Sequence, residues 1–184
     1  MSHEPGLFVA VVGASGAGKD SIIAGARRQL ARDPRIEFVR RVITRAPDPD
    51  GENHLAVTPE EFHQMAAFHR FALQWEAHGL SYAIPSTAFD AVDHGLVAVA
   101  NLSRRSLPEL AVAGLPYLIV EIVTAPDILA QRLAARGRES ADDIRARLSR
   151  EAAVPAGLNV TRLANDGALS DAISDFVRLL RDRA

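Results

Sequence analysis

The sequence contains no cysteine, which excludes both a disulfide framework and a thiolate metal site. It has no excess of either charge, because the net charge is −2 at pH 7, so neither nucleic acid nor an anionic membrane is expected as a partner. The apolar run at residues 7–12 is far shorter than the roughly 20 residues that a membrane-spanning helix requires. No basic segment of a signal peptide precedes that run, and the six histidines show no metal-ligand spacing. These absences favour a cytoplasmic enzyme.

Lysine is almost absent as well. Of the 21 basic residues, 20 are arginine and the remaining one is Lys19. A preference for arginine codons explains the 20 but not the exception. A compact ammonium on a flexible stem fits inside a tight phosphate-binding loop where a planar guanidinium does not. The position of Lys19 therefore indicates a specific function.

Apolar runs and helix signals alternate along the 184 residues, which predicts an α/β fold of three layers with a parallel central sheet. A chain of this length is expected to form one domain, residues 1–184. Strands are predicted at residues 7–12, 36–43, 71–77, 96–100, 117–123 and 159–163. Helices are predicted at residues 19–32, 86–94, 126–136 and 168–183, and one more begins at Thr58. Residues 44–85 are expected to form a small inserted subdomain.

A glycine-rich segment follows the first predicted strand and precedes the first predicted helix. Residues 13–20, GASGAGKD, match the P-loop (Walker A) pattern GxxxxGK, but aspartate stands where the pattern has serine or threonine. Glycines let the backbone turn tightly and aim successive N–H groups at phosphate oxygens, and the helix dipole adds positive potential. The segment predicts an ATP site. Its expected residues are Gly13, Ala14, Ser15, Gly16, Ala17, Gly18, Lys19, Asp20 and Ser21.

The aspartate in this loop needs a cation. A carboxylate beside a triphosphate is repelled unless a positive ion lies between them. We therefore expect Asp20 to approach Mg²⁺ directly or through water, with Ser21 as the alternative ligand. An aspartate that only begins a helix is the remaining interpretation.

The following segments resemble guanylate kinase over nearly the whole chain. The similar motifs are RVITRAP at residues 41–47, GEN at 51–53, VTPEEF at 57–62 and FALQWEAHGLSYAIP at 71–85. The resemblance implies a P-loop kinase fold with an acceptor-binding insertion at 44–85. The sequence also departs from guanylate kinase at three positions. Leu73 and Ile84 stand where guanylate kinase hydrogen-bonds guanine, and Asn101 replaces an aspartate. Without those polar partners, guanine binding is expected to be poor.

The phosphate-binding positions of the acceptor site are retained or gain charge. Arg45 and Tyr82 match phosphate ligands of guanylate kinase, while Arg41 and His54 replace a serine and a tyrosine. This combination resembles the ribose 1,5-bisphosphate phosphokinases of phosphonate catabolism. The motifs similar to that family are GKDS at residues 18–21, GENH at 51–54, Asn101 with SR at 103–104, RGRE at 136–139 and NDG at 165–167.

That resemblance implies ATP-dependent conversion of ribose 1,5-bisphosphate to 5-phospho-α-D-ribose 1-diphosphate. It implies Mg²⁺ as cofactor, and Arg41, Arg45, His54, Tyr82 and Asn101 as acceptor-site residues. Lys19, Arg136 and Arg138 would be catalytic. A lid at residues 136–150 would close over ATP, with Arg147 and Asn165 as further nucleotide contacts, although a plain turn at residues 165–167 is also open.

Three alternatives stay open at the level of sequence. A guanylate or other nucleoside monophosphate kinase is the nearest, and a P-loop kinase for another sugar phosphate is the next. A guanylate-kinase-like module that only binds partners is the third, although such modules usually lose the phosphate loop, which is intact here. The oligomeric state is not predicted.

Overall fold

The fold contains a five-stranded sheet in which every strand pair is parallel, seen in a computed structural model that describes residues 5–47, 52–135 and 153–184. Its strands, in spatial order, are β2 (Ile36–Phe38), β7 (Val97–Asn101), β1 (Leu7–Gly13), β8 (Tyr117–Val123) and β9 (Val160–Ala164). The parallel central sheet predicted from the sequence is confirmed. Since β1 lies in the middle, the segment that follows it begins at the centre of the sheet edge.

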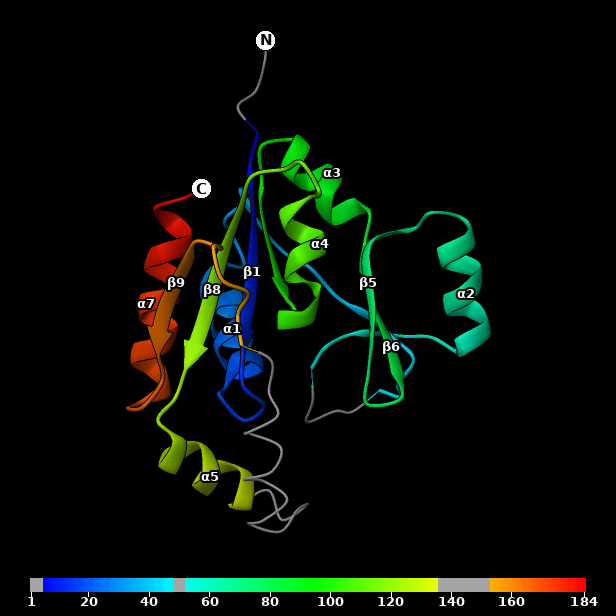
Figure 1. The fold of residues 1–184 in the computed structure, drawn as a ribbon. Coiled ribbons are helices and arrows are strands. Elements are labelled where there is room, and N and C mark those ends of the chain that lie inside the picture. The colour runs from blue at the N-terminus through cyan, green and yellow to red at the C-terminus, as the bar shows by residue number, and fades with distance from the viewer. Residues whose placement is uncertain (1–4, 48–51, 136–152) are drawn as a thin grey trace.

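Helices cover both faces of this sheet (Figure 1). They are α1 (Lys19–Gln29), α3 (Thr87–Asp93), α4 (Leu107–Ala111) and α7 (Leu169–Arg181), with a 3-10 helix η1 (Arg104–Ser106) before α4. Helix α5 (Pro126–Ala135) lies beyond the end of the sheet, near the segment that follows β1. None of the helices in the described ranges has both the length and the apolar character needed to cross a membrane.

Alternate residues of β1 point into two separate cores, because side chains alternate along a strand. Val9 and Val11 pack with α1 and α7 in a core that includes Phe176. Phe8 and Ala10 pack with α3 and α4 on the opposite face. A strand buried on both sides explains why β1 reads as a continuous apolar run.

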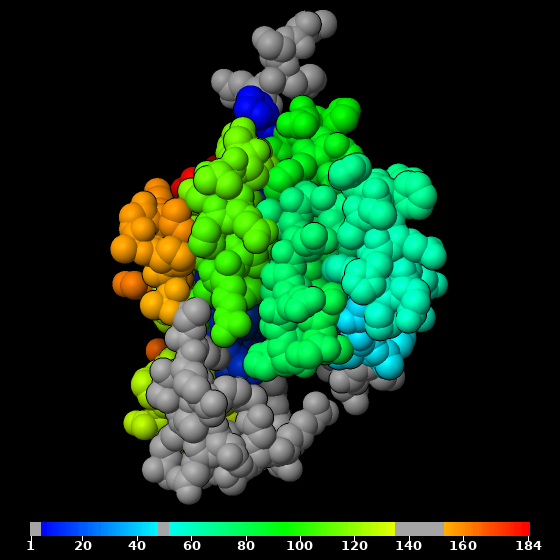
Figure 2. All heavy atoms as spheres, turned by 45° about the vertical axis from the view of Figure 1, so that its right-hand side comes forward, coloured from blue at the N-terminus to red at the C-terminus, as the bar shows by residue number. Residues whose placement is uncertain are grey.

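A second, smaller sheet stands beside the first (Figure 1). Its strands, in spatial order, are β4 (Leu55–Ala56), β3 (Val42–Ile43), β6 (Leu80–Pro85) and β5 (Phe71–Ala77). Helix α2 (Pro59–Ala67) packs on it through Phe62, which is buried against Val42 and Ala83. In the space-filling view this part, coloured cyan to green, adjoins the larger part directly (Figure 2).

The strand predicted at residues 36–43 is wrong as a single element. Residues 36–38 form β2, which pairs with β7 in the first sheet, and residues 42–43 form β3 in the second. The chain therefore leaves one sheet and enters the other within this apolar run. Strands β4 and β6 were not predicted, and β6 completes the hairpin with β5.

The predicted start of α2 is confirmed in its details. The Thr58 side chain accepts a hydrogen bond from the Glu61 backbone N–H at 3.1 Å, and the Glu61 carboxylate accepts from the Thr58 N–H at 2.8 Å. This reciprocal capping box satisfies backbone N–H groups that have no partner within the helix, and Pro59 fits the first turn.

Replacing Thr58 with alanine removes the capping oxygen. We expect the free energy of unfolding to fall by about 1 kcal/mol, measured by chemical denaturation. Thr58→Ser keeps the hydroxyl, so its free energy of unfolding should fall much less. Equal losses in the two variants would contradict a role for the hydroxyl.

Candidate active site

The candidate site lies at the edge of the first sheet where the parallel strands end. The phosphate loop follows β1, Asn101 closes β7, Thr124 follows β8 and Asn165 follows β9. The register places Asn101 directly beside Val11 of β1. The carboxyl ends of parallel strands are where ligands bind in open α/β sheets.

Glycines of the phosphate loop adopt a backbone conformation that other residues rarely adopt. Gly16 has φ 85° and Gly18 has φ 92°, a left-handed conformation that other residues adopt only with strain. Gly18 is also the N-cap of α1, and no side chain in the described ranges caps this end of the helix by a hydrogen bond. The positive end of the α1 dipole thus points toward the phosphate loop, as in anion-binding helix ends.

Lys19 lies over the loop that precedes it. Its ammonium donates to the carbonyl oxygens of Gly13 at 2.7 Å and Ala14 at 2.9 Å. These contacts hold the ammonium against the loop that would surround the phosphates in a P-loop nucleotide site. The geometry fits the role predicted for Lys19.

Asn165 fixes the loop from the neighbouring strand end. Its side-chain Nδ2 donates to the Ala17 carbonyl at 2.7 Å, and the residue is only 3% exposed. Its Oδ1 is buried and has no hydrogen-bond partner within the described ranges. The next residue, Asp166, accepts from the Ala125 N–H at 2.7 Å. Asn165 therefore positions the phosphate loop, while its predicted contact with the nucleotide stays a prediction.

Asn101 meets the phosphate loop rather than the second sheet. Its Nδ2 donates to Asp20 Oδ1 at 2.7 Å. Asp20 and Ser21 both lie exposed in the first turn of α1. The structure thus brings a predicted acceptor-site residue into contact with a predicted metal ligand.

Arg41 is held in place on the second sheet. It forms a two-pronged ion pair with Glu52, in which Nε donates to Oε1 at 2.7 Å and Nη2 donates to Oε2. Its guanidinium carbon also lies 5.2 Å from the ring centre of Tyr82 and 5.8 Å from that of Trp75. These two rings are stacked, with centres 5.5 Å apart. The pair with Glu52 uses Nε and Nη2 and leaves the Nη1 group for another acceptor.

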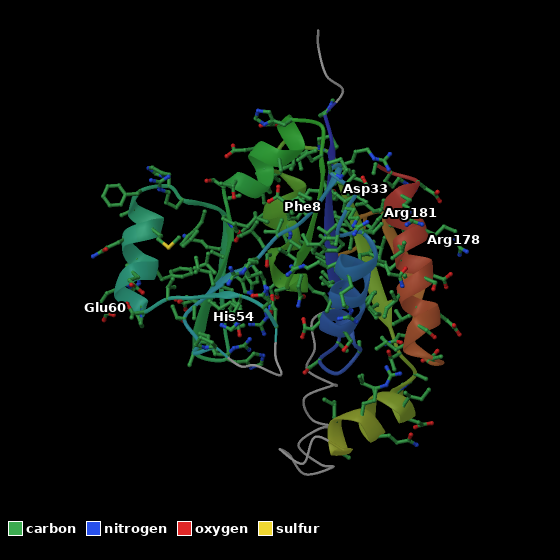
Figure 3. The ribbon with its side chains drawn as sticks, turned by 180° about the vertical axis from the view of Figure 1, so that it is seen from behind. Phe8, Asp33, His54, Glu60, Arg178 and Arg181 are labelled. Atoms are coloured by element: carbon green, nitrogen blue, oxygen red, sulfur yellow. The ribbon has the colours of Figure 1, made fainter. Side chains whose placement is uncertain are left out.

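His54 is buried and joins two parts of the same segment. Its Nδ1 lies 2.9 Å from the Glu52 carbonyl oxygen and its Nε2 lies 3.0 Å from that of Arg45. Arg45 Nη2 is 3.5 Å from the same Nδ1. In Figure 3 His54 lies inside the second-sheet part, whereas Glu60 projects outward from α2. His54 therefore positions Arg45 and Glu52, and direct binding of substrate by His54 stays a prediction.

Positive charge is concentrated around this segment. Burial lowers the pKa of the Arg27 guanidinium from its usual value, and the nearby charge of Arg40 lowers it further, while Glu52 acts in the opposite direction. Arg40 itself donates to the His54 carbonyl oxygen at 3.0 Å. Closely spaced guanidiniums of this kind suit a ligand that carries several negative charges.

The two apolar positions noted in the sequence face each other. Leu73 of β5 and Ile84 of β6 are direct cross-strand partners, and both are buried, at 5% and 0% exposure. They belong to the core that contains Ala100 and Leu102. Neither position can supply a hydrogen bond to a base.

Two carboxylates of interest were missed in the sequence. Glu52 appeared there only as part of a motif, and nothing in the sequence indicated that it pairs with Arg41. Glu121 is a buried carboxylate on β8 that pairs with Arg104 at 3.0 Å and Arg162 at 3.3 Å. A charged residue inside the apolar strand YLIVEIV was the available signal.

Some predicted residues lie outside the described part of the chain. These are Arg136, Arg138 and Arg147, together with the expected lid at 136–150. Their roles remain predictions.

The oxygen donors near the loop fit Mg²⁺. This ion prefers oxygen ligands and is usually held by one or two carboxylates together with substrate phosphates. Asp20 offers a carboxylate and Ser21 a hydroxyl at the start of α1. In the ranges that the structure describes, no group of three or more His, Cys, Asp or Glu side chains could hold a metal ion by itself. A cation that arrives with a nucleotide suits this arrangement.

Comparison with known proteins identifies the family. No family model matches the chain. It is 45% identical over 178 residues to the ribose 1,5-bisphosphate phosphokinase PhnN of Agrobacterium fabrum, covering 96% of this chain and 97% of that protein. It is 43% identical over 180 residues to the protein of the same name from Brucella melitensis, covering 97% and 94%. The chain belongs to the PhnN family.

The fold of this PhnN-family chain resembles that of guanylate kinase. The guanylate kinase from Anaplasma phagocytophilum superposes with a TM-score of 0.65 at 15% sequence identity, over 99% of this chain and 88% of that one. This likeness shows the fold alone. It confirms the predicted three-layer, guanylate-kinase-like architecture, and the relatives confirm the resemblance to the ribose 1,5-bisphosphate phosphokinases.

Gly18 offers a direct test of the phosphate loop. A Cβ added there would lie 2.4 Å from Asn165 Nδ2 and would require φ 92°. We expect the clash to displace the loop in Gly18→Ala and to weaken ATP binding by about tenfold or more, since one lost hydrogen bond to a charged group costs about 1.5–3 kcal/mol. Isothermal titration calorimetry measures the affinity.

Gly114→Ala is the matched control. It has φ 77° but meets no atom within 4 Å, so it carries the backbone strain without the clash. It should leave ATP affinity unchanged. A similar loss of affinity in both variants would show that the clash with Asn165 does not cause the effect.

Proposed function

We propose that this protein transfers the γ-phosphoryl group of ATP to ribose 1,5-bisphosphate, giving ADP and 5-phospho-α-D-ribose 1-diphosphate. The proposal is supported by full-length relatives named for this activity at 43–45% identity. It is also supported by a phosphate loop with the geometry of a nucleotide site.

The observation that carries the choice of acceptor is the pairing of Leu73 with Ile84. In guanylate kinase the matching positions hydrogen-bond guanine. Here both are buried aliphatic side chains in a continuous core. A guanine amide or amine placed against them would lose its hydrogen bonds to water and gain none. The site instead favours an acceptor recognised through phosphate groups.

The reaction needs alignment and charge neutralisation rather than a base. The nucleophile is an oxygen of the acceptor's 1-phosphate, which is already ionised at pH 7. A bond forms from this oxygen to the γ-phosphorus, the bond from that phosphorus to the β,γ-bridging oxygen breaks, and ADP leaves with the electron pair. Two polyanions must be brought together in line, so fixed positive charges supply most of the catalysis.

The nucleotide is assigned to the first sheet. Lys19 and the N–H groups at the start of α1 hold the triphosphate on the first sheet. Mg²⁺, which Asp20 and Ser21 would hold, neutralises phosphate charge when it is bound. Arg136, Arg138 and Arg147 are assigned to the same nucleotide by family resemblance.

The acceptor is assigned to the second sheet. Arg41, fixed by Glu52 and by the stacked rings of Trp75 and Tyr82, presents its remaining N–H groups to a phosphate. Arg45, positioned by His54, supplies a second guanidinium, and its buried Nε has no hydrogen-bond partner in the described ranges. A phosphorylated sugar suits this site, because it offers phosphates to the two guanidiniums and carries no base that needs hydrogen-bond partners.

A panel of acceptors tests the substrate. We expect kcat/KM for ribose 1,5-bisphosphate to exceed that for GMP by at least about two orders of magnitude, because the polar groups that recognise a base are lost. The measurement is a coupled assay of ADP release with ribose 1,5-bisphosphate, GMP, AMP and ribose 5-phosphate. Comparable rates with GMP would overturn the substrate while leaving the kinase assignment in place.

The single lysine tests the donor site. Lys19→Met removes the ammonium but keeps a side chain of similar length, and we expect kcat to fall by at least about 10³-fold, a loss of the size measured for arginine fingers, the groups that stabilise the transferring phosphoryl charge. Arg28→Met, at an exposed position near the end of α1, is the control and should keep its activity. Wild-type turnover by Lys19→Met would refute the proposed nucleotide site.

A further inference from the structure

Two polar residues next to the phosphate loop are exchanged relative to the common P-loop pattern. In that pattern Mg²⁺ is held by a serine or threonine of the loop and by an aspartate that follows a neighbouring strand. Here the loop position holds Asp20, and the strand-end position holds Asn101 at the end of β7. Compared with the common pattern, the carboxylate stands on the loop instead of at the strand end, and the neutral polar side chain stands at the strand end instead of on the loop.

The exchanged residues are in direct contact. Asn101 Nδ2 donates to Asp20 Oδ1 at 2.7 Å. Asn101 is 8% exposed and is fixed by the sheet, because it pairs with Val11, whose carbonyl accepts from the Leu102 N–H at 2.9 Å. Asp20 lies at the exposed start of α1. A rigid amide thus fixes one oxygen of an exposed carboxylate at the start of α1, directly after Lys19.

We propose that Asp20 and Asn101 form an exchanged cation-binding pair. Asp20 is the carboxylate ligand of the divalent cation that accompanies the nucleotide, and Asn101 is a positioning residue that orients this carboxylate. The inference rests on the proposed nucleotide site but not on the identity of the acceptor.

Charge explains why the two positions depend on each other. With Asp20 on the loop, an aspartate at position 101 would place two carboxylates at hydrogen-bond distance, where they repel each other. With a threonine on the loop, Asn101 would leave the pair without a carboxylate. Either single change breaks the arrangement, whereas the two changes together recreate the common pattern.

The experiment measures how much the cation contributes to nucleotide binding, without turnover. The dissociation constant of ADP is determined by isothermal titration calorimetry in excess Mg²⁺ and again in EDTA, and the ratio of the two values is the readout. The proteins are the wild type, Asp20→Thr, Asn101→Ala, Asn101→Asp and the double variant Asp20→Thr/Asn101→Asp.

We expect Asp20→Thr to reduce this ratio by about tenfold or more, since loss of a ligand should cost at least what loss of its hydrogen-bond partner costs. Asn101→Ala, which keeps the charge but removes the donor, should reduce the ratio by about tenfold. Asn101→Asp should lower the melting temperature in EDTA and recover it in Mg²⁺. The double variant should regain most of the wild-type ratio.

Asp171→Thr is the matched control. Asp171 is also an exposed aspartate in the first turn of a helix, on α7, so the same substitution tests for a general effect of charge at a helix start. Its ratio should equal that of the wild type.

Two results would overturn the inference: an unchanged ratio in Asp20→Thr, or a double variant that binds no better than Asp20→Thr while its circular dichroism is native. Failure of the proposed function is distinguishable. Absence of ADP binding by the wild type in both conditions would refute the nucleotide site. Normal Mg²⁺-dependent binding without phosphorylation of ribose 1,5-bisphosphate would refute only the acceptor.

Discussion

The conformation of the phosphate loop depends on two asparagine amides from neighbouring strand ends. Asn165, after β9, donates to the Ala17 carbonyl of the loop. Asn101, at the end of β7, donates to Asp20, the second residue of α1. Both amides are buried and lie at the carboxyl ends of strands of the same parallel sheet. A glycine-rich turn has many accessible conformations, so a defined anion-binding shape requires rigid neighbours of this kind.

The second sheet holds positively charged arginine side chains close together. Guanidiniums that face one polyanionic ligand repel one another before it binds. Glu52 offsets the charge of Arg41, the Trp75 and Tyr82 rings provide a surface for it, and His54 ties the backbone of the segment together. The positive charges are thereby placed in advance, which lowers the cost of organising them when substrate arrives.

Local features of the fold were predictable from the sequence. The buried strand at β1, the glycine loop and the capping box at Thr58 each depend on residues that are close together in the chain. The division of residues 36–43 between two sheets was not predictable, because β2 and β3 are distinguished by their partners and not by their own residues: β2 pairs with β7, whereas β3 pairs with β4 and β6. Strand β6 was missed although its partner β5 is adjacent in the chain, joined to it by the tight turn at His78 and Gly79.

The site shows the same division between local and long-range information. Lys19, Asp20 and the apolar pair Leu73 and Ile84 were identified from motifs. The contacts that connect Asp20 with Asn101, and Arg41 with Glu52, join separate segments through side-chain geometry. Motifs in a sequence identify the residues of a site, but they do not identify which of these residues are in contact, because contacts depend on rotamers and strand register.

The stacked aromatic pair has a practical consequence for spectroscopy. Trp75 is the only tryptophan in the chain, so indole emission arises from one place in the molecule. That place lies beside Tyr82 and under the guanidinium of Arg41. Any event that moves this arginine alters the electric field on the indole ring, so the protein carries its own unlabelled optical reporter for the second sheet.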